Sequence, residues 1–214
     1  MSKPGRLIYG VGVNDYPHPV SAEGIVNGCR KRVWRCDFYE AWTHMLARCY
    51  SQKLHENRPT YIGCTVAPEW HRFSVFREWM MAQEWQGMDL DKDVLCPGNK
   101  VYSSETCAFI PRKLNLFLSL KQSQRGQFPV GVLLNKAKDG FESQCHNPFT
   151  GKREHLGRFA SAESAHEAWR SRKHEHACRF ADMQKDPRVA HALRLRFAPG
   201  FVEQVEALKA RGSR

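Results

Sequence analysis

The stretch Leu90–Asn115, LDKDVLCPGNKVYSSETCAFIPRKLN, holds the residue types best suited to chemistry on a phosphate group. Asp91 and Asn115 offer a carboxylate and a carboxamide, whose oxygens can hold a divalent cation or orient a phosphate. Lys92 adds an ammonium group, which binds phosphate but is protonated at neutral pH and does not act as a base. Asp91, Lys92 and Asn115 are therefore candidates for contact with a metal ion or a phosphate.

Two strands and a helix must position these side chains. Leu90-Asp91 is predicted to end a first strand, Gly98-Asn99 to form a loop, Thr106–Ile110 to form a second strand, and Asn115 to stand on a helix. In order and spacing the stretch resembles the ββα-metal fold of HNH homing endonucleases. That resemblance implies a site where a histidine activates water and an acid and a helix residue hold Mg²⁺ or Mn²⁺. Lys92 stands where that family has its histidine. If the chain is a nuclease, the resemblance implies Asp91, Lys92 and Asn115 as its catalytic residues.

The replacement of this histidine leaves three interpretations open. The chain is an active endonuclease or nickase that uses Asp91 and Asn115 with a divalent metal. Alternatively, it is a DNA-binding scaffold with weak or no cleavage, and Lys92 contacts phosphate. In the third interpretation Lys92 is a solvated residue of a strand-end turn. Three neighbouring cations are further DNA-binding candidates, namely Lys100, Arg112 and Lys113.

A second motif lies in Pro129–Trp169, where strands are predicted over Val130–Leu134, Gly140–Cys145 and Glu154–Phe159. Ser161 is predicted to cap the long helix that follows. The segment resembles the Apetala-type (ethylene-response) DNA-binding domain, in which a three-stranded antiparallel sheet lies in the major groove. The resemblance implies that cations and polar side chains project from the sheet and its turns; the candidates are Lys136, Lys138, Gln144, Arg153, His155 and Arg158. The alternative is a sheet that serves only as a spacer or dimer surface.

The two motifs together predict an α+β protein of four parts. Residues 1–35 form an irregular arm whose segment Cys29–Cys36 grips a phosphate backbone or lies over the core. Residues 36–121 form the HNH-like domain with two preceding helices; Asp37 is predicted to cap the first, and the second is predicted over Glu69–Trp85 with an apolar stripe. The polar segment 122–127 is the predicted linker. Residues 128–183 form the Apetala-type domain, and 186–214 a helical tail that starts at Asp186-Pro187. This order resembles that of phage homing endonucleases. It implies a phage-encoded protein that binds double-stranded DNA in the cytoplasm of a bacterial host. The alternative to DNA binding is an inhibitor whose basic face binds an acidic surface of a host protein.

Charge supports a polyanionic partner. The 214 residues include 33 Lys and Arg against 22 Asp and Glu, and residues 121–214 alone hold 18 against 10. Such an excess is typical of proteins that neutralise phosphates, so we expect no small-molecule substrate. No apolar run approaches the roughly 18–20 residues that span a bilayer, so we expect no membrane contact.

The eight cysteines are widely spaced, which favours reduced thiols over a disulfide framework. Four of them fall in the predicted first domain and are weak candidates for a structural zinc site: Cys36, Cys49, Cys64 and Cys107. Zinc sites usually include a close pair such as CxxC, and the chain has none. Buried free thiols are therefore the main expectation.

Overall fold

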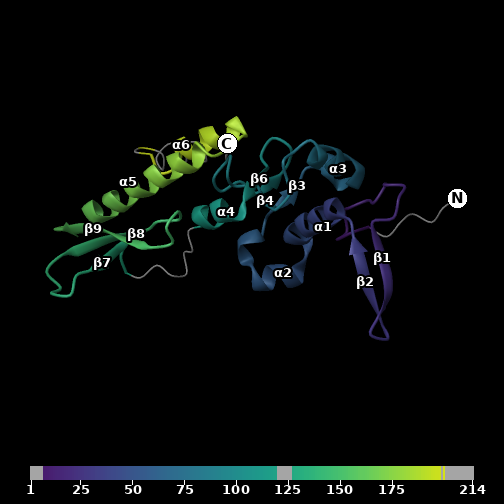
Figure 1. The fold of residues 1–214 in the computed structure, drawn as a ribbon, viewed down its shortest axis with the longest axis horizontal. Helices are drawn as coiled ribbons and strands as arrows, with labels where there is room; N and C mark the ends of the chain where they lie inside the picture. Colours follow the sequence, from purple (N-terminus) through teal and green to yellow (C-terminus); the bar gives the residue numbers. More distant parts are fainter. Residues whose placement is uncertain (1–6, 120–126, 199, 201–214) are drawn as a thin grey trace. The chain divides into compact units, whose positions relative to one another are not determined.

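The computed structural model describes residues 7–119, 127–198 and 200. The chain is mixed α+β, as predicted, and divides into two compact units, Met1–Pro111 and Arg112–Arg214 (Figure 1). Within the described residues there are six α-helices, three two-stranded sheets and one three-stranded antiparallel sheet. None of these helices is both long and apolar enough to cross a bilayer.

The first unit contains short strands around three α-helices and two 3-10 turns. In chain order its elements are β1 (Ser21–Val26), β2 (Cys29–Arg35), α1 (Asp37–Tyr50), α2 (Gln52–Asn57), η1 (Pro59–Tyr61), β3 (Thr65–Val66), η2 (Pro68–His71), α3 (Phe73–Met81), β4 (Met88–Asp91), β5 (Val101–Tyr102) and β6 (Ala108–Pro111). Strands β1–β2 and β4–β6 pair antiparallel, whereas β3–β5 pair parallel.

The irregular arm expected over residues 1–35 instead contains the β1–β2 hairpin. Asn27 and Gly28 form its two-residue turn, and both have positive φ angles, 53° and 73°. Asn-Gly is the preferred pair for such a turn because both residues adopt left-handed backbone conformations at little cost. The hairpin is therefore encoded locally, although its strands lack alternating burial.

The helices of the first unit differ from expectation at their ends. Helix α1 begins at Asp37, and Cys36 is the N-cap, so the predicted Asp37 cap is wrong by one residue. The helix expected over Glu69–Trp85 is divided into η2 and α3, because Arg72 between them has an extended backbone. The apolar stripe still faces inward, and Trp42, Phe73 and Phe76 are fully buried in one core.

The second unit contains α4 (Arg112–Leu118), β7 (Val132–Leu134), β8 (Phe141–His146), β9 (Arg153–Phe159), α5 (Ala162–Ala181) and α6 (Pro187–Leu195). Its sheet has the order β7-β8-β9, and α5 lies along one of its faces (Figure 1).

Local signals correctly predicted the second unit's main elements. The Ser161 hydroxyl accepts a hydrogen bond from the Ser164 N–H at 3.1 Å, and the Asp186 carboxylate accepts one from the Arg188 N–H at 2.8 Å. Gly131 has a φ of 85°, and a Cβ there would lie 2.2 Å from the Trp169 ring, so close packing requires glycine. Of the predicted linker 122–127, residues 122–126 lie outside the described residues, as does the predicted helical tail beyond residue 200.

Candidate functional site

Asp91 closes the turn that follows β4. Its Oδ1 accepts hydrogen bonds from the backbone N–H groups of Asp93 at 2.8 Å and Val94 at 2.6 Å. Burial raises the pKa of this carboxyl group above its ordinary value, against the opposing effect of these hydrogen bonds. One oxygen of the predicted metal or phosphate ligand thus binds the backbone of the turn that follows it.

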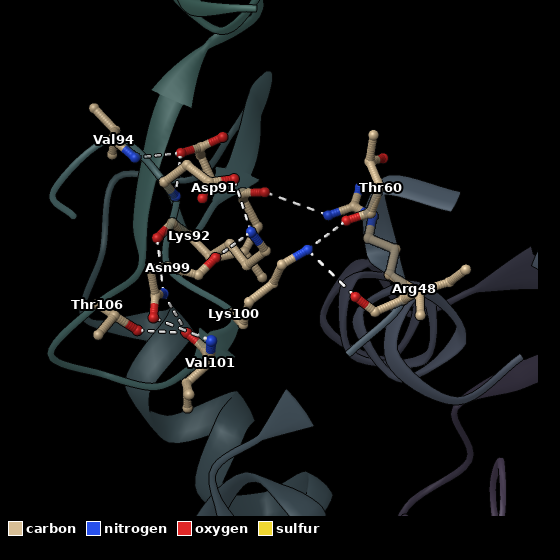
Figure 2. Close-up of polar contacts among 12 residues, drawn as sticks. Arg48, Thr60, Asp91, Lys92, Val94, Asn99, Lys100, Val101 and Thr106 are labelled. Carbon is tan, nitrogen blue, oxygen red and sulfur yellow. Dashed lines mark hydrogen bonds and ion pairs between the residues drawn. The ribbon is translucent and has the colours of Figure 1, made fainter. Parts of the chain in front are cut away.

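Lys92 lies inside this turn. Only 6% of it is exposed, and its ammonium donates to Asp93 Oδ2 at 2.8 Å and to the Asn99 carbonyl at 2.5 Å (Figure 2). A buried ammonium with two internal acceptors is not placed to meet a phosphate in solvent. The expectation of a solvated lysine is therefore wrong, because the Lys92 side chain is buried and joins the two sides of the turn. The phosphate contact stays a prediction that these hydrogen bonds do not favour.

Asn99 completes the same network. Its amide nitrogen donates to the carbonyls of Lys92 at 2.9 Å and Val101 at 2.6 Å, and its Oδ1 accepts from the Val101 N–H at 3.1 Å (Figure 2). Lys100, although exposed, donates to the carbonyls of Thr60 and Ile62 at 2.8 and 3.3 Å. The polar side chains of this loop mainly hold the loop itself.

The remaining candidates of the first motif belong to the second unit. Asn115 is half-buried on α4, and Asp91 and Asn115 thus lie in different units. Arg112 and Lys113 are exposed at the start of α4. The ammonium of Lys113 lies 5.5 Å from the centre of the Phe149 ring, a cation–π distance.

The residues around Asp91 do not fit a divalent cation. One Asp91 oxygen is occupied by two N–H groups, the Asn99 carboxamide makes three backbone hydrogen bonds, and the positive charge of Lys92 acts on Asp91. Across residues 7–119 and 127–198, no three His, Cys, Asp or Glu side chains are grouped so that they could hold a metal ion.

The four cysteines considered for zinc are free thiols. Cys49, Cys64 and Cys107 are buried in the core of the first unit, and Cys36 is half-buried beside it. Burial raises the pKa values of Cys49 and Cys107 to about 12, which keeps these thiols protonated and unreactive at neutral pH. They serve as small apolar core residues.

In the second unit, strand register gathers the candidate DNA-binding side chains on one face of the sheet. Cross-strand partners point to the same side of an antiparallel sheet, and the pairs here are Glu142–Arg158, Gln144–His155 and His146–Arg153. Leu133, opposite Glu142 on β7, joins them. We call this surface the open face; its residues are Leu133, Glu142, Gln144, His146, Arg153, His155 and Arg158.

The intervening positions point toward α5. Ser143 and Cys145 are buried, and their cross-strand partners are Gly157 and Glu154. The two faces stay distinct despite a bulge near Ser143, where Gly157 adopts a φ of 125°. Among the described elements of the second unit, α5 packs on this side of the sheet, and Arg153, His155 and Arg158 on the open face are exposed.

The open face is cationic and polar. Arg153 is exposed and has no ion pair within the described part of the chain, whereas Arg158 lies 3.3 Å from the Glu142 carboxylate. Lys136 and Lys138 are exposed in the turn that joins β7 to β8. That turn is closed by the Asn135 N–H bond to the Gly140 carbonyl at 2.9 Å, which places both lysines at one end of the face.

A polar cluster behind the sheet was missed by the sequence interpretation. Glu154 of β9 accepts hydrogen bonds from Arg172 at 2.9 and 3.0 Å and from Asn147 at 2.8 Å, and it lies 3.2 Å from His176 Nε2. Hydrogen bonds, first that from Arg172, lower the pKa of Glu154 to about 2. Lys173 is 9% exposed and donates to the Phe117 carbonyl at 2.9 Å.

The missed residues did carry a signal. Trp169, Lys173, His176 and Phe180 recur three or four residues apart, which places them on the same inner stripe of α5. A lysine and a histidine on an inner stripe need polar partners, so contacts with the sheet could have been predicted for Lys173 and His176.

The two units differ strongly in charge. Residues 1–111 hold 13 Lys and Arg against 12 Asp and Glu, whereas residues 112–214 hold 20 against 10. The open face thus belongs to the unit that has nearly all of the chain's net positive charge. No protein-family model, curated protein or solved structure matches the chain.

Proposed function

We propose that this chain binds double-stranded DNA and that the open face of the β7–β9 sheet enters the major groove. The observation that supports this most directly is the strand register, which puts Gln144, Arg153, His155 and Arg158 on the side that α5 leaves uncovered. Arginines at the edges suit phosphates, while the central Gln144–His155 pair suits base edges.

In this proposal residues 128–183 form an Apetala-type DNA-binding domain, and residues 36–121 form a degenerate relative of the HNH scaffold. Antiparallel pairing of β4 with β6, followed along the chain by α4, supports the second assignment. The engagement of Asp91, Lys92 and Asn99 within their own turn favours binding over cleavage. A phage-encoded protein acting in a bacterial cytoplasm is part of the same proposal.

The test is fluorescence anisotropy of a labelled duplex titrated with the full chain at several salt concentrations. A protein that makes about six phosphate contacts should lose on the order of a thousandfold in affinity between 50 and 200 mM salt. Binding that does not change with salt would contradict DNA binding by this cationic surface.

Paired variants then locate the surface. Arg153→Ala with Arg158→Ala should reduce the slope of log affinity against log salt by about two. The control, Lys185→Ala with Arg194→Ala, removes the same charge from exposed residues away from the sheet and should leave the slope nearly unchanged. Equal effects from the two pairs would exclude the open face as the docking surface.

A further inference from the structure

The β1–β2 hairpin is exposed on both faces. Every residue of β1 except Gly24, and every residue of β2 except Arg35, is exposed. These include large apolar side chains: Ile25 is 81% exposed, and Trp34 is 49% exposed. Figure 1 draws the hairpin as a ribbon that extends from the start of α1. A two-stranded ribbon with neither face covered contributes little to a core, so its residues need another explanation.

The hairpin also holds the positive charge of the first unit. Its 15 residues, 21–35, include four cations and one acid, Glu23. The rest of residues 1–111 has nine Lys and Arg against eleven Asp and Glu. The net positive charge of the first unit therefore comes from this ribbon, whose side chains are mostly exposed.

Register divides these cations between the two faces of the ribbon. Arg30 pairs with Ile25 and Arg32 with Glu23, so both arginines project from one face. Lys31 pairs with Gly24 and projects from the other. Arg30 lies 2.7 Å from the Glu23 carboxylate, while Arg32 and Lys31 have no ion pair within the described residues.

The base of the ribbon is fixed to α1. The Arg35 guanidinium donates to the Thr43 hydroxyl and lies 3.9 Å from the Glu40 carboxylate. The Cys36 N–H donates to the Val20 carbonyl at 2.9 Å, which closes the ribbon at its root. Arg35 is thus a structural anchor, and Arg30, Lys31 and Arg32 lie farther out, toward the Asn27-Gly28 turn.

We propose that the β1–β2 hairpin is a second DNA-binding arm, in which Arg30, Lys31 and Arg32 contact the phosphates that border a groove. This inference rests on the proposed DNA-binding function and adds a separate surface to it. The major groove admits a two-stranded ribbon, and strands of six or seven residues span roughly 20 Å. A groove has a phosphate backbone on each side, so cations on both faces find partners, whereas a flat anionic surface would meet only one face.

The experiment uses the full chain in the same anisotropy assay. Arg30→Ala with Arg32→Ala should reduce the salt slope by about two and weaken binding by roughly tenfold at low salt. Arg30→Lys with Arg32→Lys should retain the slope, because charge rather than fork geometry is required. Glu23→Gln, which releases Arg30 from its ion pair, should tighten binding.

The matched control is Lys53→Ala with Arg58→Ala, which removes two exposed cations from around α2 of the same unit. It should change affinity by less than twofold, and unchanged circular dichroism should accompany all variants. If Arg30→Ala with Arg32→Ala binds DNA like the wild type or like this control, the proposal of a second DNA-binding arm is wrong. The arm is also overturned if those variants lose binding to anionic lipid vesicles but not to DNA.

The outcomes separate the two proposals. Loss with the Arg153 and Arg158 variants but not with the hairpin variants would overturn the arm and leave the open face as the docking surface. Loss with the hairpin variants alone would support the arm and overturn the open face. Wild-type binding that is absent or independent of salt would overturn both.

Discussion

The ammonium of Lys92 joins two parts of one turn, the Asp93 carboxylate and the Asn99 carbonyl. Because the Lys92 side chain is almost entirely buried, these two bonds replace the hydration that its ammonium has lost. A residue that in sequence suggests phosphate binding is here part of the internal structure of the β4–β6 connection. The surrounding Asn99 hydrogen bonds make the same turn rigid from the other side.

Replacing this lysine should therefore affect folding. We expect Lys92→Met, which keeps the length of the apolar stem, to reduce the free energy of unfolding by about 1–3 kcal/mol, because the Asn99 carbonyl loses its buried donor. Lys53→Met, at an exposed position on α2, should change it by less than about 0.5 kcal/mol. Urea denaturation followed by circular dichroism measures both. Equal stability of the two variants would mean that the ammonium makes no net contribution.

At the scale of elements, the contact between α5 and the sheet depends on protonation. Burial lowers the pKa of His176 below its ordinary value of 6.5, and hydrogen bonds, chiefly from Arg172, lower that of Glu154 from 4.5 to about 2. For both groups the unfolded chain takes up the proton at a higher pH than the folded chain does. Their contribution to stability is therefore present at high pH and is lost as pH falls.

The directions of these two pKa shifts define the pH range in which stability should change. Between pH 7 and pH 5, His176 should make the second unit less stable as pH falls, and Glu154 should add its effect only below about pH 4.5. Urea denaturation at pH 7 and pH 5 measures the change. His176→Gln should reduce this loss, whereas His155→Gln, on the open face, should retain it. A loss that is the same in both variants would show that another group controls the pH dependence.

Some helices and strands could be predicted from local sequence signals, and others could not. The cap at Ser161, the proline after Asp186 and the alternation along β8 are local signals, and each element appeared as predicted. The Asn27-Gly28 turn was equally local, but the flanking strands bury neither face and so lack the pattern by which strands are recognised. At Arg72 the backbone forms a parallel bridge with Val13, a tertiary contact that the helical spacing of the aromatic residues did not reveal.

The candidate site residues also divide into those placed by local geometry and those placed by tertiary contacts. Register places Gln144 and His155 together because alternation along a strand is fixed by backbone geometry. The burial of Lys92 depends instead on how residues seven positions away fold back over it, and residue type alone indicates exposure for a lysine. The Glu154 cluster joins residues from β9 and α5, so neither segment reveals it alone.

At the scale of the whole molecule, nearly all of the net positive charge belongs to one unit, whereas Asp91 and Lys92 belong to the other. The first unit is nearly neutral and contains Asp91, whereas the second unit has ten more cations than acids. A metal nuclease needs its carboxylate free to hold a cation, and Asp91 uses an oxygen to close its own turn beside the positive charge of Lys92. The molecule therefore combines a strongly basic second unit with a turn in which Asp91, Lys92 and Asn99 make hydrogen bonds to the turn itself.

We accordingly expect binding without cleavage. Supercoiled plasmid incubated with the chain and either Mg²⁺ or Mn²⁺ should shift in a gel at low salt and should return to the supercoiled position after the protein is removed. Nicked or linear product that disappears in both Asp91→Ala and Asn115→Ala would contradict this expectation and identify an active nuclease. Product that persists in both variants would instead have a source other than these residues, and Asp91→Asn, which retains an oxygen acceptor for the turn, controls for loss of folding.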